Sequence, residues 1–335
     1  MIGINKINQH FVIIAYSFLV GALASMLGLH GDVAAVISET IRQNEGQKNF
    51  IDYSIHFPFL TSMLMKLSSW ILNPTKIFVI YSGLINLIYS YLIFKIALII
   101  NSSNAMGVAL ISASWFIPTI GGYYYDNVAI AIGFFQFYIL LKNKNSYVFK
   151  NIIIGLLCVL VVMIKQSTGL AIIIPISIYF LISSYNNNLL KQIFFISFGI
   201  IIGIILVWAH LETLSPGYSK IYFTELYNVS AIYAENTKRV SIKNLIYVII
   251  FPYNINIFSS NSFSLGVILF YPIIIIQYLF YFAWIKLDID KLNFYIFVLI
   301  GTILTEFIVG RGSINLAYFL GLQLLCLFSI KKSYL

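Results

Sequence analysis

Five ionisable residues interrupt or border long apolar segments, although they are spread over almost the whole chain. They are Asp32, Asp126, Lys165, Glu306 and Arg311. A charged side chain within or beside a membrane span is costly, so such residues usually mark a functional site. Two carboxylates can divide the tasks of a general base and of substrate positioning. A lysine and an arginine are suited to holding a phosphate.

Asp32 opens the stretch GDVAAVISETIRQNEG, which follows directly on the first long apolar run. The apolar residues of VAAVISETIRQ recur at i, i+3, i+4 and i+8, whereas Glu39 lies on another face. This spacing predicts an amphipathic helix over 33–45 that lies in the membrane interface. Asp32 can be the N-cap of this helix, a role that Asp fills well. A capping carboxylate is also held in position, so the cap and a catalytic role are compatible.

Two aromatic stretches leave a structural and a functional interpretation open. In IDYSIHFPFLTSMLMKL, Tyr53 and His56 can belong to an interfacial aromatic belt or can line a substrate site. PTIGGYYYDNVAIAIGFF ends one apolar run, turns on two glycines and opens the next run at Tyr125 and Asp126. Asp126 can again be an N-cap, with the three tyrosines at the level of the lipid headgroups.

Two further stretches bring cations to apolar segments. In VVMIKQSTGLAIIIP, Lys165 and Gln166 are followed by two hydroxyl residues, a combination that suits a phosphate or a sugar. Lys165 can instead extend its amine to the headgroups, as lysines at helix ends often do. In LTEFIVGRGSINLAYF, Glu306 precedes Arg311 by about one turn. The two can form an internal ion pair, or the guanidinium of Arg311 can bind a phosphate.

The composition places these residues in a membrane protein. Of the 335 residues, 60% are hydrophobic and only 9% are charged, and the mean hydropathy is +0.93. A soluble domain has about a quarter of its residues charged. The net charge of +9 therefore indicates basic residues at membrane borders and not a nucleic-acid partner. We expect an all-α polytopic membrane protein with a single transmembrane domain, 1–335.

About ten apolar segments are long enough to serve as membrane spans. Short loops that contain lysine, such as KNKNSYVFK and IKLDIDK, share one side with both termini, and the positive-inside rule makes that side cytoplasmic. The opposite side receives two long loops, 31–75 with its interfacial helices and 212–262. The predicted spans are 10–30, 76–98, 104–120, 127–141, 150–165, 167–184, 192–211, 263–284, 292–309 and 314–330.

In order and placement, these segments resemble the GT-C superfamily of membrane glycosyltransferases. The resemblance is to bacterial relatives of the protein O-mannosyltransferases and of the aminoarabinose transferase, of the family-39 type. An acid just after the first span matches Asp32, and an aromatic-His-Pro segment is similar to YSIHFPFL. A second acid that opens a later span is similar to YYYDNVAIAIGFF, and a Lys-then-Gly segment is similar to IKQSTGLAIIIP. Many members have two adjacent acids in the first loop, whereas this chain has one, unless Glu39 replaces the second.

The resemblance implies a hexosyl or pentosyl transferase of the bacterial inner membrane, which works in the assembly of cell-surface polysaccharide or lipopolysaccharide. The donor would be a polyprenyl-phosphate sugar and the acceptor a glycan or a lipid-linked glycan on the external face. Asp32 would be the general base, and Asp126 would orient the acceptor, support the base or help to hold a divalent cation if one is used. Lys165 and Arg311 would stabilise the leaving phosphate. Glu39, Tyr53, His56, Tyr125 and Gln166 would complete the substrate site.

Two other functions remain open. A polysaccharide polymerase of the Wzy type also has many spans and uses external arginines, and its working part would be the 212–262 loop. A transporter or lipid flippase would carry charged residues in the middle of its spans. Here they lie mostly at the external ends, which favours a transferase.

Overall fold

In the computed structural model, the described part of the chain is almost wholly helical. It comprises 6–26, 31–54, 60–100, 103–120, 123–142, 147–184, 188–237, 275–276, 278–282, 292–305 and 316–328. The helices within it are α1 (Lys6–Met26), α2 (Gly31–Asn44), α3 (Leu60–Lys66), α4 (Pro74–Ile99), α5 (Ala105–Ile120), α6 (Tyr125–Lys142), α7 (Tyr147–Ile164), α8 (Gln166–Ser184), α9 (Leu189–Leu214), α10 (Tyr218–Thr237), α13 (Leu292–Leu304) and α14 (Leu316–Phe328). The β contact recorded in these residues is an isolated bridge between Asn49 and Tyr53.

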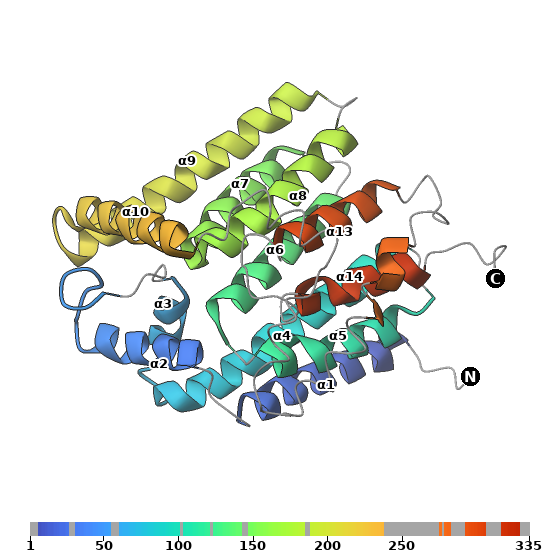
Figure 1. Ribbon diagram of the computed structural model, residues 1–335, viewed down its shortest axis with the longest axis horizontal. Helices are drawn as coiled ribbons and strands as arrows, with labels where there is room; N and C mark the ends of the chain where they lie inside the picture. Colours follow the sequence, from blue (N-terminus) through green and yellow to red (C-terminus); the bar gives the residue numbers. More distant parts are fainter. Residues whose placement is uncertain are drawn as a thin grey trace.

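The long helices form a bundle, and shorter elements lie across one of its ends. α4 packs against α1, α5 and α6, and α7 packs against α6, α8 and α9. α2, α3 and α10 gather at the left-hand end of the bundle in Figure 1. We call α2, α3, α10 and the turn segment 45–54 the cap.

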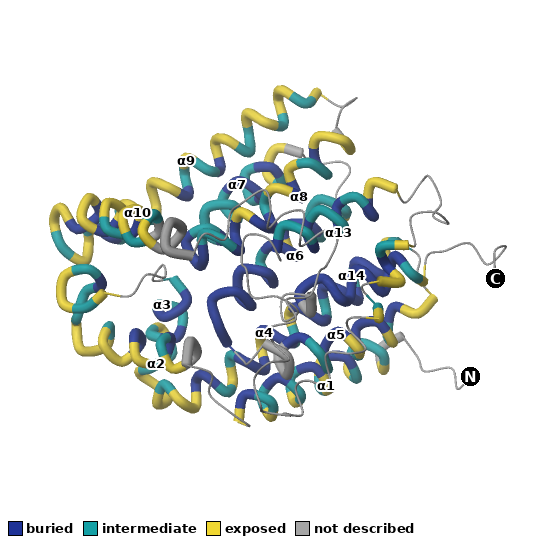
Figure 2. Tube along the Cα trace, in the orientation of Figure 1, coloured by how far each residue is buried: buried dark blue, intermediate teal, exposed yellow. Residues whose placement is uncertain are grey.

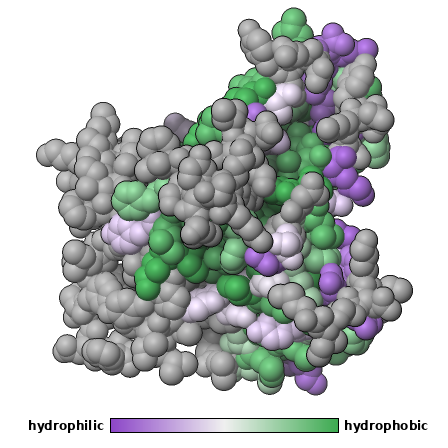
Figure 3. Space-filling model, turned by 90° about the vertical axis from the view of Figure 1, so that its right-hand side faces the viewer, coloured by the Kyte–Doolittle hydropathy of each residue, from purple (hydrophilic) through white to green (hydrophobic). Residues whose placement is uncertain are grey.

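The apolar character of the helices confirms the predicted class, a helical membrane protein. Four helical stretches, in α1, α4, α8 and α9, are long and apolar enough to cross a membrane, and four shorter apolar helical stretches accompany them in the described part of the chain. The end of the bundle opposite α2 and α3 shows a largely apolar described surface, with hydrophilic residues mainly along one edge (Figure 3). Most of the predicted span 263–284 lies outside the described residues, so the number of spans stays a prediction.

Burial differs sharply between the centre and the side of the bundle. The apolar window of α4 is 61% buried within the protein, whereas that of α9 is only 11% buried. Figure 2 shows the same contrast, with α9 exposed along most of its length. Most of its exposed residues are large and apolar, among them Phe194, Ile201, Ile205 and Trp208. An apolar exposed face of this kind is suited to contact with lipid chains.

Two boundaries differ from the sequence prediction. α2 begins at Gly31, so Asp32 lies within its first turn and does not precede it as an N-cap. The predicted long loop 212–262 begins with the end of α9 and then α10. α10 forms because Tyr218, Tyr222 and Leu226 recur every four residues and pack together against Met163 and Leu211.

Small residues set the distance between α7 and α9. A Cβ atom at Gly199 would collide with the backbone carbonyl of Ile152, and one at Gly155 would collide with that of Ile196. Neither contact can relax by a rotamer change, because both obstacles are backbone atoms. The glycines therefore allow the two backbones to approach closely, as small residues do between membrane helices.

We predict that Gly199→Ala lowers the free energy of unfolding by about 1–3 kcal/mol, the usual cost of overpacking a close interface. The measurement is thermal unfolding of the purified protein in a mild detergent. Gly107→Ala is the control, because an added Cβ there meets no atom within 4 Å. Equal unfolding temperatures for the two variants would contradict the proposed packing role.

Candidate functional site

The segment Tyr123–Asp126, at the start of α6, joins the cap to the bundle. All four side chains are buried, with Asp126 and Tyr125 fully excluded from solvent. The Tyr123 backbone N–H donates to Ser82 Oγ of α4 at 2.7 Å, and its hydroxyl donates to the Thr61 carbonyl of α3 at 3.1 Å. The three tyrosines therefore lie inside the protein and do not form the headgroup-level belt that the sequence allowed.

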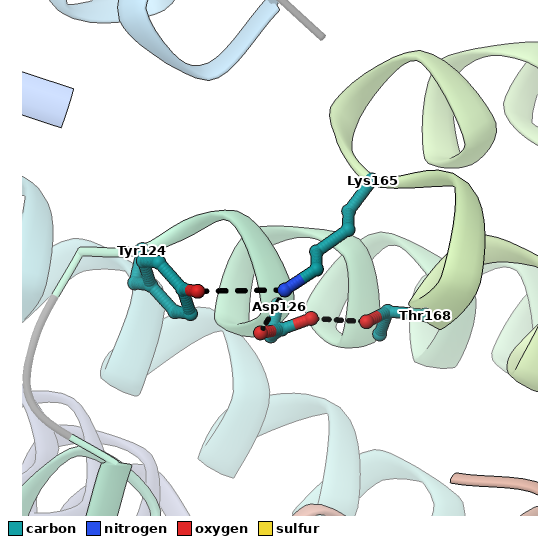
Figure 4. Close-up of polar contacts among 4 residues, drawn as sticks. All are labelled: Tyr124, Asp126, Lys165 and Thr168. Atoms are coloured by element: carbon teal, nitrogen blue, oxygen red, sulfur yellow. Dashed lines mark hydrogen bonds and ion pairs between the residues drawn. The ribbon is translucent and has the colours of Figure 1, made fainter. Parts of the chain in front are cut away.

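Asp126 forms a buried ion pair with Lys165, which is the single non-helical residue between α7 and α8. Lys165 Nζ lies 2.7 Å from Asp126 Oδ2, and the Thr168 hydroxyl donates to Oδ1 of the same carboxylate. Lys165 Nζ also donates to the Tyr124 hydroxyl at 3.4 Å and lies 5.1 Å from the centre of the Tyr124 ring. Figure 4 shows these side chains converging from α6 and from the α7–α8 junction.

This geometry decides between the earlier interpretations of both charged residues. Lys165 is buried and points at Asp126, so it does not extend to the headgroups. Both carboxylate oxygens of Asp126 are engaged by side chains of another part of the chain, so Asp126 does not act as an N-cap. Its place in the first turn of α6 still favours the negative charge, because the helix dipole is positive there.

A second buried acid, Glu39 of α2, is connected to this ion pair through tyrosine side chains. The Tyr125 hydroxyl donates to Glu39 Oε2 at 2.8 Å, and Gln43 Nε2 lies 3.5 Å from Oε1. Burial raises the pKa of Glu39 to about 7, although hydrogen bonds from Tyr125, Ser62 and Gln43 oppose the shift. Adjacent tyrosines thus connect the two acids, since Tyr124 contacts Lys165 and Tyr125 contacts Glu39. A carboxyl group with a pKa near neutrality can both accept and donate a proton.

A pocket opens between the cap and the end of α9, with a volume of about 540 Å³. We call it the cap pocket. Tyr53 and Gln43 form part of its wall, and the guanidinium of Arg42 lies 5.1 Å from the centre of the Tyr53 ring. Burial and the nearby charge of Glu39 raise the pKa of Tyr53. The lining residues are Gln43, Gly46, Gln47, Lys48, Asn49, Tyr53, Met63, Lys66, Leu67, Trp70, His210, Leu211, Leu214 and Tyr218.

The structure brings together part of the predicted site. Glu39, Tyr125, Asp126 and Lys165 form one connected group, and Gln166 is the half-buried first residue of α8. The backbone of Asp32 belongs to α2, but its side chain lies outside the described part of the structure, as do residues His56, Glu306 and Arg311 entirely. The roles predicted for these four remain predictions.

Four further residues take part that the sequence prediction did not include in the site. Thr168 contacts Asp126, Tyr124 contacts Lys165, and Gln43 and Ser62 surround Glu39. Gln43 could have been inferred, because it follows Glu39 by four residues on a predicted helix. Ser62 could not, because only the packing of α3 on α2 brings it to Glu39. No group of three or more His, Cys, Asp or Glu side chains placed to hold a metal ion occurs among the described residues.

We predict that Lys165→Met lowers the free energy of unfolding by about 3–5 kcal/mol, because it leaves the Asp126 carboxylate buried without its partner. Asp126→Asn combined with Lys165→Met should cost much less than the sum of the two single changes. The measurement is a double-mutant cycle of thermal unfolding in detergent. Additive effects would show that the two charges do not depend on each other.

Glu39 predicts a pH dependence of stability. Its pKa is about 7 in the folded protein, above its ordinary value of 4.5, so folding favours the protonated form. This stabilisation is complete below pH 4.5 and disappears as the pH rises through 7. Between pH 5 and 8 we expect a loss of about 2–3 kcal/mol that Glu39→Gln abolishes. The control is Glu45→Gln, which changes an exposed residue just beyond the same helix and should leave the pH dependence unchanged. If Glu39→Gln kept the pH dependence, Glu39 would not be the group that causes it.

Comparisons with models of protein families, with curated proteins and with solved structures found no match for this chain. The site consists of an acid with a pKa of about 7 and a buried ion pair. Two adjacent tyrosines link them at one end of an apolar helix bundle.

Proposed function

We propose that this protein is an integral-membrane glycosyltransferase. It moves a sugar from a polyprenyl-phosphate donor to a glycan or lipid-linked acceptor on the external face of the bacterial inner membrane, in cell-surface polysaccharide or lipopolysaccharide assembly. The observation that carries the proposal is the placement of Glu39, a buried acid with a pKa of about 7, which accepts a hydrogen bond from Tyr125, the residue directly before Asp126 of the Asp126–Lys165 pair. A proton acceptor and a cation near the same membrane face are the two groups that such a transfer needs.

The proposed reaction is a displacement at the anomeric carbon of the donor sugar. A hydroxyl of the acceptor attacks this carbon and loses its proton to a carboxylate, while the bond between the sugar and the phosphate oxygen breaks. The electron pair of that bond leaves with the lipid phosphate. Lys165, which Asp126 and Tyr124 hold in place, supplies a positive charge that stabilises the leaving group.

Two acids on α2 are candidates for the base. Asp32 and Glu39 are seven residues apart, and positions seven apart lie on one face of an α-helix, about 10 Å apart along its axis. Glu39 has the raised pKa that suits a proton acceptor at neutral pH, and Asp32 lies nearer the start of the helix. We assign proton transfer to this pair and the orientation of Lys165 to Asp126.

The position of the charged residues argues against a carrier. Asp126 lies in the first turn of α6 and Lys165 lies between two helices, so both are at helix ends. A transporter requires such groups along a path through the middle of the membrane. A site at the membrane face suits a substrate whose lipid chain stays in the bilayer.

The test is mass spectrometry of surface glycans from a deletion strain that carries wild type or a variant. Glu39→Gln and Asp32→Asn should each reduce transfer by about 100-fold or more, the usual contribution of a general base, if that residue takes the proton. We expect one defined sugar to be lost in at least one of these strains, and Glu45→Gln to restore it as wild type does. Full rescue by both variants would contradict the assignment. Glycans that stop at a single repeat unit would make the protein a polymerase of the Wzy type.

A further inference from the structure

The cap pocket lies at the end of α9, the least buried of the four described helices that are long and apolar enough to cross a membrane. Its lining includes His210, Leu211 and Leu214, which form the last turn and a half of α9. The preceding part of α9 is long and apolar enough to cross a membrane and exposes large apolar side chains along its length. The pocket therefore opens at the border of the bilayer, where lipid headgroups lie.

The two charged residues of the pocket wall are both lysines, and a histidine lies with them. Lys48 comes from the turn after α2, Lys66 ends α3 and His210 lies near the end of α9. None of the lining residues is Asp or Glu, and within the described part of the chain neither lysine forms a salt bridge. The neighbouring acid Asp52 accepts a hydrogen bond from the Lys48 backbone N–H at 2.7 Å. Two lysines line the pocket and no carboxylate residue does, so the lining is suited to an anion.

The rim of the pocket is apolar and open. Trp70 is 81% exposed, and the lining residues Leu67 and Leu214 are exposed as well. An indole at this level is typical of residues that lie among lipid headgroups. The pocket thus combines two amines for an anion with an apolar edge that continues toward the lipid-facing side of α9.

We propose that the cap pocket binds a phosphate ester, namely the headgroup of a membrane phospholipid, with Lys48 and Lys66 on the phosphate and Leu67, Trp70 and Leu214 against the lipid chain. Basic pockets at membrane borders bind anionic headgroups in this way. The inference rests on the composition of the pocket and does not require the proposed sugar transfer. A bound lipid would also connect α3 with the corner between α9 and α10. Lys66 belongs to α3 and Lys48 to the turn after α2, whereas His210 belongs to α9.

The experiment is native mass spectrometry of the purified full-length protein in a neutral detergent. Phosphatidylglycerol and phosphatidylcholine with the same acyl chains are titrated in parallel. We expect wild type to bind phosphatidylglycerol more tightly, and Lys48→Gln/Lys66→Gln to weaken that binding about tenfold or more, since each lysine adds to the attraction. Lys76→Gln is the matched control, because it removes an exposed charge that does not line the pocket. It should bind within about twofold of wild type, as expected for a charge that makes no contact with the phosphate.

Two further measurements make the outcome decisive. Equal unfolding temperatures of the double variant and wild type establish that the fold is intact, so that lost binding reports on the site. Competition by sn-glycerol 3-phosphate distinguishes a soluble phosphate ester from a lipid as the ligand. If it displaces phosphatidylglycerol at a concentration comparable to that of the lipid, the phosphate contact is supported and the ligand is a soluble ester. If it does not displace the lipid, the ligand is the lipid. Equal binding of the two lipids by wild type, or unchanged binding by the double variant, would overturn the proposal. Because binding is the readout, either result leaves the glycan test of the proposed function independent.

Discussion

The buried ion pair between Asp126 and Lys165 is the interaction on which the arrangement of this end of the bundle depends. A charge removed from water costs several kcal/mol unless a partner and further hydrogen bonds accompany it. Asp126 meets this requirement through Lys165 and Thr168, and Lys165 also contacts Tyr124. Because the partners come from the start of α6 and from the junction of α7 and α8, three helices must keep their relative positions for the pair to survive.

The tyrosines next to Asp126 extend this constraint to the cap. Tyr123 bonds to α3 and α4, and Tyr125 bonds to Glu39 on α2. A shift of α6 that disturbed the ion pair would therefore also disturb the surroundings of Glu39, whose pKa depends on burial. The proposed base and the proposed cation are in this sense parts of one packed unit, although Glu39 and Lys165 lie far apart in the sequence.

The surface of the molecule follows a second constraint, which is the surrounding membrane. α4 lies mostly inside the protein, whereas α9 presents apolar side chains outward along its length. Where α9 ends, the apolar surface gives way to the cap pocket with its lysines. A polar site that borders an apolar surface is the arrangement required for a substrate or a lipid with its chain in the bilayer and its phosphate outside it.

The sequence by itself determined the helical membrane class, because the apolar runs and the low charge leave few other solutions. It also placed an amphipathic helix after the first span, since the spacing of its apolar residues has a helical period, and it singled out Glu39, Tyr125, Asp126 and Lys165. It could not pair Asp126 with Lys165 or bring Ser62 to Glu39, because these residues lie 39 and 23 positions apart and only packing brings them together. The tertiary structure also decided that the three tyrosines lie inside the protein, since an aromatic run looks the same in a sequence whether it faces headgroups or a buried ion pair.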